Sequence, residues 1–231
     1  SYCGGVPKIP NPFRYKFSWA PLGVLKALRS PSRSLKNFEE FKVARPWDAI
    51  TSYDAPLPQP ESFEVYPNRD SYPFMEDYRF DPAWRVKDFV RGTIRLNGWE
   101  AAWTPVFREI ETLSGPTGDA RLAEMADQFV RENSYAPGEP DRVILFVSLK
   151  AERDGKIMFH ETWSMDAWGD AKGTAMARLV STPVSFAVES LLAGDIAAGV
   201  HPAPHDPKLY TKWLGQVRGL VQYMERLDHI A

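Results

Sequence analysis

Three arginines stand in two short segments whose residue types suit the binding of an anion. Arg91 and Arg95 flank Thr93, and Arg69 follows Pro67-Asn68. On a β-strand, residues four apart share a face and lie about 13 Å apart at the backbone, so two long side chains can converge on one ligand. Arginine holds a carboxylate in a fixed orientation because its planar fork donates two parallel hydrogen bonds. The segments therefore predict a carboxylate site; the alternative for each arginine, a solvated surface charge, stays open.

Both arginine segments are attached to predicted strands. The run from Trp84 to Leu96 alternates apolar and polar residues, which is typical of a half-buried strand. A second strand is expected over 63–66, and it ends just before Arg69. A loop that follows a strand can present a side chain into a cleft.

Helical spacing of apolar residues predicts the elements around these strands. A short helix is expected over 21–28, because its proline stands at an early position where the missing amide does no harm. Two amphipathic helices are expected over 103–113 and, after a cap at Asp119, over 122–130. The segment 114–118 should join them.

The runs 142–151 and 156–165 predict a hairpin. Asp154-Gly155 lies between them and tolerates the positive φ of a tight turn. With this turn, Leu149 and His160 should be cross-strand partners. We interpret His160 as packed or hydrogen-bonded within the sheet; a catalytic role is the alternative.

The last third of the chain is expected to be mainly helical. A loop over 163–172 should lead into a helix over 173–193, interrupted or restarted near Pro183. A final helix should begin at Asp206-Pro207 and carry an apolar face as far as Leu227.

Composition excludes several classes of protein. The net charge of -2 offers no field that would attract nucleic acid or anionic lipid. The longest apolar runs are far shorter than the roughly 20 residues that span a bilayer, and the first residues do not resemble a signal peptide. We therefore expect neither a nucleic-acid nor a membrane partner.

Cysteine and histidine usage argues against a metal site. Cys3 is the only cysteine, so an internal disulfide and a cysteine-based zinc site are excluded. The four histidines form no His-x-x-x-His pair on a predicted helix, because His201 and His205 fall in a proline-rich stretch. No metal is expected, and a reducing cytoplasm is the predicted location. Nothing local to Cys3 supplies the base that a nucleophilic thiol needs.

The sequence contains no phosphate-binding turn. Neither Gly-x-Gly-x-x-Gly nor Gly-x-x-x-x-Gly-Lys-Ser/Thr occurs. The chain by itself is therefore not expected to hold a nicotinamide dinucleotide.

Three segments, in this order, resemble the saccharopine dehydrogenase family in its glutamate-forming branch. They are Cys3-Gly4-Gly5-Val6-Pro7 running into Tyr15-Lys16-Phe17-Ser18-Trp19, then Tyr66-Pro67-Asn68-Arg69-Asp70-Ser71, then Arg91-Gly92-Thr93-Ile94-Arg95. In that family the Cys-Gly-Gly segment follows an N-terminal dinucleotide-binding domain. The chain is thus expected to be the C-terminal, substrate-binding part of such an enzyme, without its cofactor domain and inactive alone.

The resemblance assigns roles to particular residues. It implies that Arg69 and the run Arg91, Gly92 and Thr93 contact saccharopine, and Arg95 is added as a candidate on its matching segment. It also implies that Cys3 and the turn formed by Ser18, Trp19, Ala20 and Pro21 contact the cofactor. For Gly4 and Gly5 a simple flexible turn is the alternative. The general acid or base is not identified.

The implied reaction is the NAD(P)-dependent interconversion of saccharopine with glutamate and aminoadipate semialdehyde, in which a hydride is transferred to an imine. A homodimer is also implied. Ala20, Leu22 and Leu96-Asn97 depart from the family pattern, which leaves open the choice between NAD and NADP and the exact amino acid.

Two other functions stay open. The same scaffold could serve a lysine 6-dehydrogenase or a carboxylated-polyamine dehydrogenase, whose substrates carry fewer carboxylates. A non-catalytic dimerisation or ligand-binding module is the alternative from a different class.

The predicted fold is α/β, with a mixed or largely antiparallel sheet flanked by helices, like the C-terminal domain of glyceraldehyde-3-phosphate dehydrogenase relatives. Residues 1–200 are expected to form the substrate-binding and dimerisation domain, and residues 201–231 a C-terminal helical segment.

Overall fold

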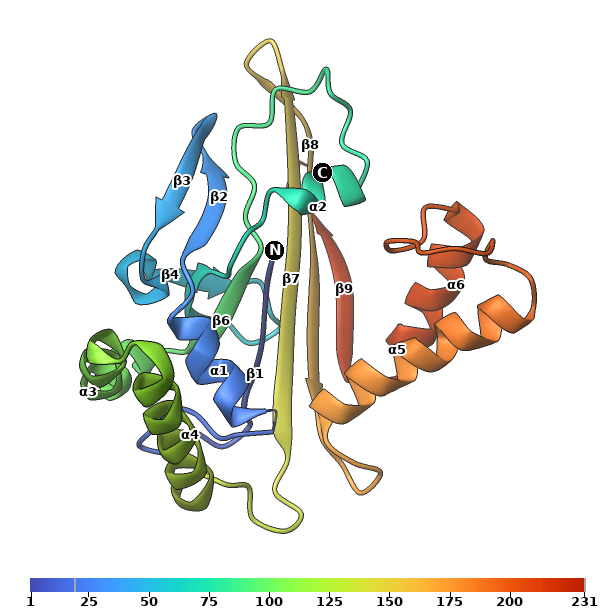
Figure 1. Ribbon diagram of the computed structural model, residues 1–231. Helices are drawn as coiled ribbons and strands as arrows, with labels where there is room; N and C mark the ends of the chain where they lie inside the picture. Colours follow the sequence, from blue (N-terminus) through green and yellow to red (C-terminus); the bar gives the residue numbers. More distant parts are fainter. Residues whose placement is uncertain (19, 231) are drawn as a thin grey trace.

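A seven-stranded sheet runs through the centre of the molecule (Figure 1). The computed structural model describes residues 1–18 and 20–230. The strand order is β4-β5-β6-β1-β7-β8-β9, and a separate hairpin pairs β2 with β3. Only the β1–β6 pairing is parallel among the described strands. The predicted α/β class with a mixed, largely antiparallel sheet is confirmed. The strands are β1 (Tyr2–Pro7), β2 (Ser32–Lys36), β3 (Glu39–Val43), β4 (Thr51–Ala55), β5 (Glu61–Pro67), β6 (Gly92–Leu96), β7 (Asp141–Arg153), β8 (Lys156–Trp168) and β9 (Tyr223–Asp228).

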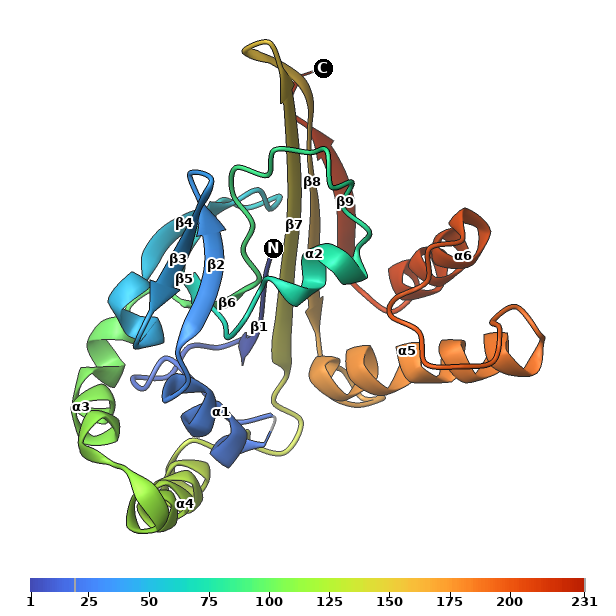
Figure 2. The same cartoon turned by 45° about the horizontal axis from the view of Figure 1, so that its top comes forward.

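Helices flank the two ends of the sheet, as both views show (Figures 1 and 2). On one side α1, α3 and α4 bury an aromatic core around Trp99 and Trp103, both fully buried. On the other side α5 and α6 form an arm that stands away from this body. The helices are α1 (Pro21–Leu28), α2 (Pro73–Asp77), α3 (Trp99–Thr112), α4 (Gly115–Glu132), α5 (Ala175–Leu192) and α6 (Pro207–Arg218), with a short 3-10 helix over Pro46–Ala49.

One face of the sheet packs against a hydrophobic core, and the other lines a cavity. One face of the central strands curls over a second core that includes Phe63, Ile94 and Phe146. The other face carries alternate residues of the same strands, such as Thr93 on β6 and Leu145 on β7, and these line a cavity. Because successive side chains of a strand point to opposite faces, one set of strands serves both the core and the cavity.

The predicted β7–β8 hairpin is confirmed, but its register differs. Asp154 and Gly155 have φ values of 52° and 74°, as a tight hairpin turn with two left-handed residues requires. A bulge between Ala151 and Glu152 shifts the register, so His160 pairs with Lys150 and not with Leu149. The predicted loop over 163–172 was also wrong, since β8 continues to Trp168 between β7 and β9.

The chain after α6 also departs from expectation. The predicted final helix starts correctly after Asp206, whose side chain accepts from the Lys208 amide, but it ends at Arg218. Residues 223–228 then pair with the free edge of β8 as β9. Apolar spacing did not reveal this, because pairing with a distant strand overrides a local preference. The division of the chain near residue 200 stays a prediction.

Two further boundaries were wrong in detail. The strand predicted over 84–96 begins only at Gly92, and the preceding residues form a loop that pairs with β2 through Phe89 and Leu35. Helix α4 begins at Gly115, after an N-cap at Ser114 and not at Asp119, because Pro116 fits its first turn. The predicted α1 is confirmed over Pro21–Leu28.

Strand β1 can reach its central place because of its glycines. A Cβ on Gly4 would overlap the carbonyl oxygen of Ile94 on β6. A Cβ on Gly5 would overlap the Met176 Cε atom at the start of α5. The close approach of the β6 backbone therefore requires glycine at position 4, whereas at position 5 the flexible end of the Met176 side chain can move aside.

We predict that Gly4→Ala lowers the free energy of unfolding by about 1–3 kcal/mol, because overpacking forces β1 away from β6. Urea unfolding followed by circular dichroism measures this change. The control is Gly215→Ala in α6, where a Cβ meets no atom within 4 Å; it should stabilise the protein by about 0.5–1 kcal/mol. Equal effects of the two variants would contradict this account of β1.

Candidate functional site

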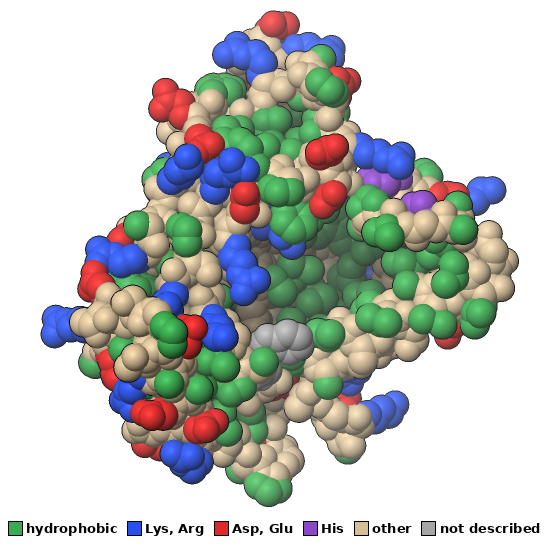
Figure 3. Space-filling view, in the orientation of Figure 1, with side chains coloured by type: hydrophobic (Ala, Val, Ile, Leu, Met, Phe, Trp, Pro, Cys, Tyr) green, Lys and Arg blue, Asp and Glu red, His purple; other side chains and the backbone are tan. Residues whose placement is uncertain are grey.

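A cavity of about 530 Å³ lies on the open face of the sheet. Strands β1, β7 and β8 form its floor, and helices α1 and α5 form opposite walls. Figure 3 shows this hollow between the α5–α6 arm and the rest of the molecule, with hydrophobic side chains on its floor and basic side chains at one rim. Its lining includes Cys3, Gly5, Tyr15, Val24, Tyr66, Asn68, Arg69, Thr93, Arg95, Val143, Leu145, Met165, Met176, Leu179 and Val217.

Arg95 places a buried positive charge in the cavity wall. Its side chain is 7% exposed, and its guanidinium carbon lies 4.9, 5.7 and 5.4 Å from the ring centres of Tyr15, Tyr66 and Trp99. Nη1 donates to the Ile94 carbonyl at 3.0 Å, whereas Nε has no partner among the described residues. A buried charge is costly unless an opposite charge or hydrogen bonds compensate it. Arg95 is thus placed to receive an anion.

Glu64, the acidic residue opposite Arg95, forms its hydrogen bonds with other partners. Glu64 is the cross-strand partner of Arg95 on β5, and opposite charges at such positions commonly pair. Instead, the Glu64 carboxylate accepts from the amides of Gly98 at 2.8 Å and Glu100 at 2.7 Å, at the start of α3. A carboxylate is stabilised at a helix N-terminus. Within residues 1–18 and 20–230, no carboxylate lies within ion-pair distance of Arg95.

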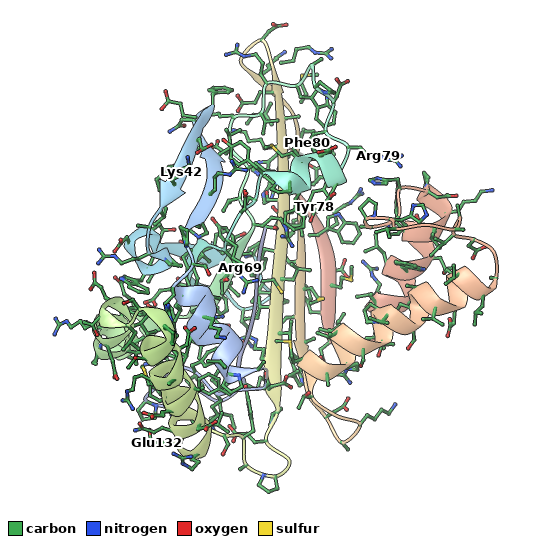
Figure 4. All side chains as sticks on the ribbon, in the orientation of Figure 1. Lys42, Arg69, Tyr78, Arg79, Phe80 and Glu132 are labelled. Carbon is green, nitrogen blue, oxygen red and sulfur yellow. The ribbon has the colours of Figure 1, made fainter. Side chains whose placement is uncertain are left out.

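Arg69 reaches the same cavity from the loop after β5 (Figure 4). Its φ of 52° marks a sharp turn. The turn is fixed to β2, since the Arg33 amide donates to the Arg69 carbonyl at 2.8 Å and the Arg33 guanidinium pairs with Asp70. Hydrogen bonding to Arg33 also lowers the pKa of Asp70. The neighbouring carboxylate is therefore bound to Arg33, and Arg69 can serve a ligand.

Three uncharged polar groups lie near the arginines. Thr93 and Cys3 are direct partners across the β1–β6 pairing, and Tyr66 pairs with Thr93 from β5. Burial raises the pKa of the Tyr66 phenol, with Arg95 opposing it. The Cys3 side chain lines the cavity and is exposed to it. Desolvation by the surrounding protein raises the pKa of its thiol to about 11, against the opposing charges of Arg95 and Arg91. At neutral pH both groups are protonated, and Cys3 is a poor nucleophile.

Two of the predicted substrate-binding residues do not line the cavity. The Arg91 guanidinium lies 3.5 Å from the ring centre of Phe74, and its backbone amide donates to the Ser71 hydroxyl at 3.0 Å. Gly92 makes room for the Tyr2 ring, which a Cβ there would overlap. Arg91 contributes to the positive field at Cys3, whereas Gly92 supports the packing of β1 on β6.

The predicted cofactor-binding residues are divided between two places. Cys3 lines the main cavity, whereas Ser18, Ala20 and Pro21 line a separate, broad hollow beside α4. Ser18 is near both, since its hydroxyl oxygen lies 3.6 Å from the Cβ position of Gly5. Trp19 lies outside the described residues.

Sequence reasoning missed the apolar half of the cavity. Asp141 positions one wall, because its carboxylate accepts from the amides of Ala175 at 2.6 Å and Met176 at 2.9 Å and so fixes the start of α5. Leu145 and Met165 form the adjoining floor. No local signal marks these residues, since each also fits an ordinary core position.

Other kinds of site find no support in the part of the chain that the structure describes. No group of three or more His, Cys, Asp or Glu side chains there could hold a metal ion. None of the described helices combines the length and apolar character needed to cross a bilayer.

Comparison with known proteins decides the family. The family model described as "Saccharopine dehydrogenase C-terminal domain" matches residues 1–220. The chain belongs to this family. A solved structure of apo saccharopine dehydrogenase (L-Glu forming) from Saccharomyces cerevisiae has the same fold, with a TM-score of 0.75 at 22% identity, and the match covers 98% of this chain and 66% of that one.

Members of the saccharopine dehydrogenase family from animals and fungi are similar in sequence. The mitochondrial alpha-aminoadipic semialdehyde synthase of Bos taurus is 25% identical over 288 residues, which cover 94% of this chain and 30% of that protein. The NADP+, L-glutamate-forming saccharopine dehydrogenase of Pyricularia oryzae is 40% identical over 102 residues, which cover 43% of this chain and 22% of that protein. The chain therefore spans less than a third of these two relatives.

The environment of Cys3 gives a testable consequence. With its pKa raised to about 11, the thiol should react with iodoacetamide at pH 8 about tenfold more slowly than an ordinary cysteine, since the loss of thiolate outweighs the gain in nucleophilicity. The rate should rise until the pH reaches the pKa. Mass spectrometry of the alkylated chain measures the rate, with free cysteine as the reference. A rate that levels off below pH 9 would contradict this environment.

Proposed function

We propose that this chain forms the substrate-binding part of a saccharopine dehydrogenase-like oxidoreductase. The reaction is the NAD(P)-dependent interconversion of saccharopine with glutamate and aminoadipate semialdehyde. The chain would hold the substrate's carboxylates and form one wall of the reaction cleft. The names of the relatives support this assignment, and it extends them to a chain that covers only part of each.

The observation that carries the proposal is the uncompensated positive charge of the cavity. Arg69 and Arg95 are the charged side chains of its described lining, and neither has a carboxylate partner among the described residues. Saccharopine carries three carboxylates, and glutamate carries two. In a recessed cavity, bidentate hydrogen bonds to guanidinium groups are strong and fix the orientation of the ligand.

The described residues fit one end of a dinucleotide but not its phosphates. Cys3 lines the substrate cavity, and the Ser18 hydroxyl lies 3.6 Å from the Cβ position of Gly5, two residues further along β1. A nicotinamide ring could meet the substrate here. The chain has no glycine-rich turn for the phosphates. A dinucleotide-binding part of the whole protein would therefore have to hold the cofactor, which supplies the hydride.

The chain's own contribution is orientation. Arg69 and Arg95 come from separate elements, and each is held in place by the contacts described above. Fixing the carboxylates holds the reacting carbon in place, and such positioning accelerates a reaction between bound groups. We assign no general acid or base: the Cys3 thiol is protonated at neutral pH, and the described lining contains no histidine or carboxylate.

Two further expectations stay predictions. They are the homodimer and the cytoplasmic location. The bovine relative, by its name, is a mitochondrial protein.

The test uses a protein in which these 231 residues are joined to a dinucleotide-binding part, as the proposal requires. Reduced nicotinamide absorbance is followed with glutamate and aminoadipate semialdehyde, first with NADPH and then with NADH. We predict turnover, and a loss of about a hundredfold in kcat/KM for Arg95→Gln, because a charged hydrogen-bonding group at a buried site is worth about 2–5 kcal/mol.

The matched control is Arg153→Gln at the exposed hairpin end, which should change kcat/KM less than twofold. Circular dichroism checks that both variants fold. Absence of turnover by the folded, cofactor-binding parent, or turnover of lysine or a carboxylated polyamine in its place, would overturn the assignment.

A further inference from the structure

The cavity has two chemically different halves. On the β5–β6 side its described lining carries Arg69, Arg95, Thr93 and Asn68, together with the apolar α1 residues Val24, Ala27 and Leu28. Beyond β1, the lining on β7, β8, α5 and α6 is apolar, and it includes Val143, Leu145, Met165, Met176, Leu179 and Val217. The change from charged to apolar follows the strand order β6-β1-β7-β8.

The dimensions of the cavity suit an elongated ligand. From β6 to β8 there are three strand spacings, or about 14 Å. The main chain of saccharopine has ten bonds and, when extended, spans about 12 Å at the rise of an extended backbone, which is about 3.5 Å for three bonds. A ligand of this length that lies across the strands has its two ends in the two different halves.

The described lining of the apolar half contains no charged or hydrogen-bonding side chain. Arg178 is the arginine on α5, and it is not part of the cavity lining. Its two terminal nitrogens donate to Asp170 at 2.8 Å and to the Trp168 carbonyl at 2.8 Å, whereas its Nε has no partner among the described residues. Val143 and Met165 are almost fully buried, at 4% and 6% exposure, within the apolar cluster under α5. A charged ligand end in contact with this wall would lose water without gaining an ion pair.

We infer that the site recognises an N-substituted glutamate only through its glutamate end. The two glutamate carboxylates bind on the arginine side. The hydrocarbon substituent on the nitrogen lies along the apolar wall, and its far end makes no specific contact with this chain. The inference rests on the proposed function, which supplies glutamate as the anionic part. It extends the ligand class to N-alkylglutamates that lack the amino-acid group at the end of the lysine arm.

The test measures binding of N-ethyl-, N-butyl- and N-hexyl-L-glutamate to this chain by isothermal titration calorimetry. Affinity should rise about two- to fourfold for each added methylene, because burying one methylene fully is worth about fourfold in affinity. N-hexylglutamate should bind within about tenfold of saccharopine, since the missing group has no partner here.

Matched variants on α5 locate the effect. Leu179 lines the cavity, whereas Leu191 on the same helix is 55% exposed and outside it. Leu179→Ser should flatten the dependence on chain length and leave the affinity for glutarate unchanged, whereas Leu191→Ser should change neither. Circular dichroism checks folding, and the series measured on the unaltered chain is decisive even if Leu179→Ser does not fold.

Equal affinity along the alkyl series, or saccharopine binding more than tenfold tighter than N-hexylglutamate, would overturn the inference. These outcomes differ from a failure of the proposed function, which appears as absent turnover by the whole protein. If affinity rises along the alkyl series but the protein does not turn over saccharopine, the inference of a charged and an apolar half stands and the assigned reaction is wrong.

Discussion

A buried guanidinium without a carboxylate partner among the described residues is the constraint around which the cavity is built. Arg95 is enclosed by Tyr15, Tyr66 and Trp99, whose rings stabilise a cation from their faces. Its natural cross-strand partner, Glu64, instead caps the start of α3. Because Glu64 holds the start of α3, the positive charge of Arg95 stays available to a ligand. Such a charge costs stability, and an anionic ligand removes that cost.

The place of β1 gives the site its second property, the meeting of polar and apolar halves. Gly4 lets β1 lie parallel to β6 next to Thr93, and Gly5 leaves room for the end of the Met176 side chain of α5. Asp141 then fixes α5 by accepting from its first amides. The floor, the charged end and the apolar wall are consequently linked through one short strand. A shift of β1 would separate groups that contact the same ligand under the proposed function.

Under the proposed function, the chain would supply anion binding and a hydrocarbon wall, while its sequence has no turn for dinucleotide phosphates. The positive charges of Arg69 and Arg95 lie on the β5–β6 side of the cavity, where they could hold carboxylates at a fixed distance from β1. Substrate orientation and hydride supply can therefore reside in different parts of one protein and meet at the cleft.

The sequence by itself determined the elements with strong local signals: the Asp154-Gly155 turn, the helix over 21–28 and the ordered motifs that carry Arg69 and Arg95. These depend on backbone preferences and residue types within a few positions. Only the tertiary structure decided that Glu64 serves α3, that Arg91 lies against Phe74 outside the cavity lining, and that β9 extends the sheet. Each of these depends on pairing between segments far apart in the chain, where competition among distant partners overrides local preference.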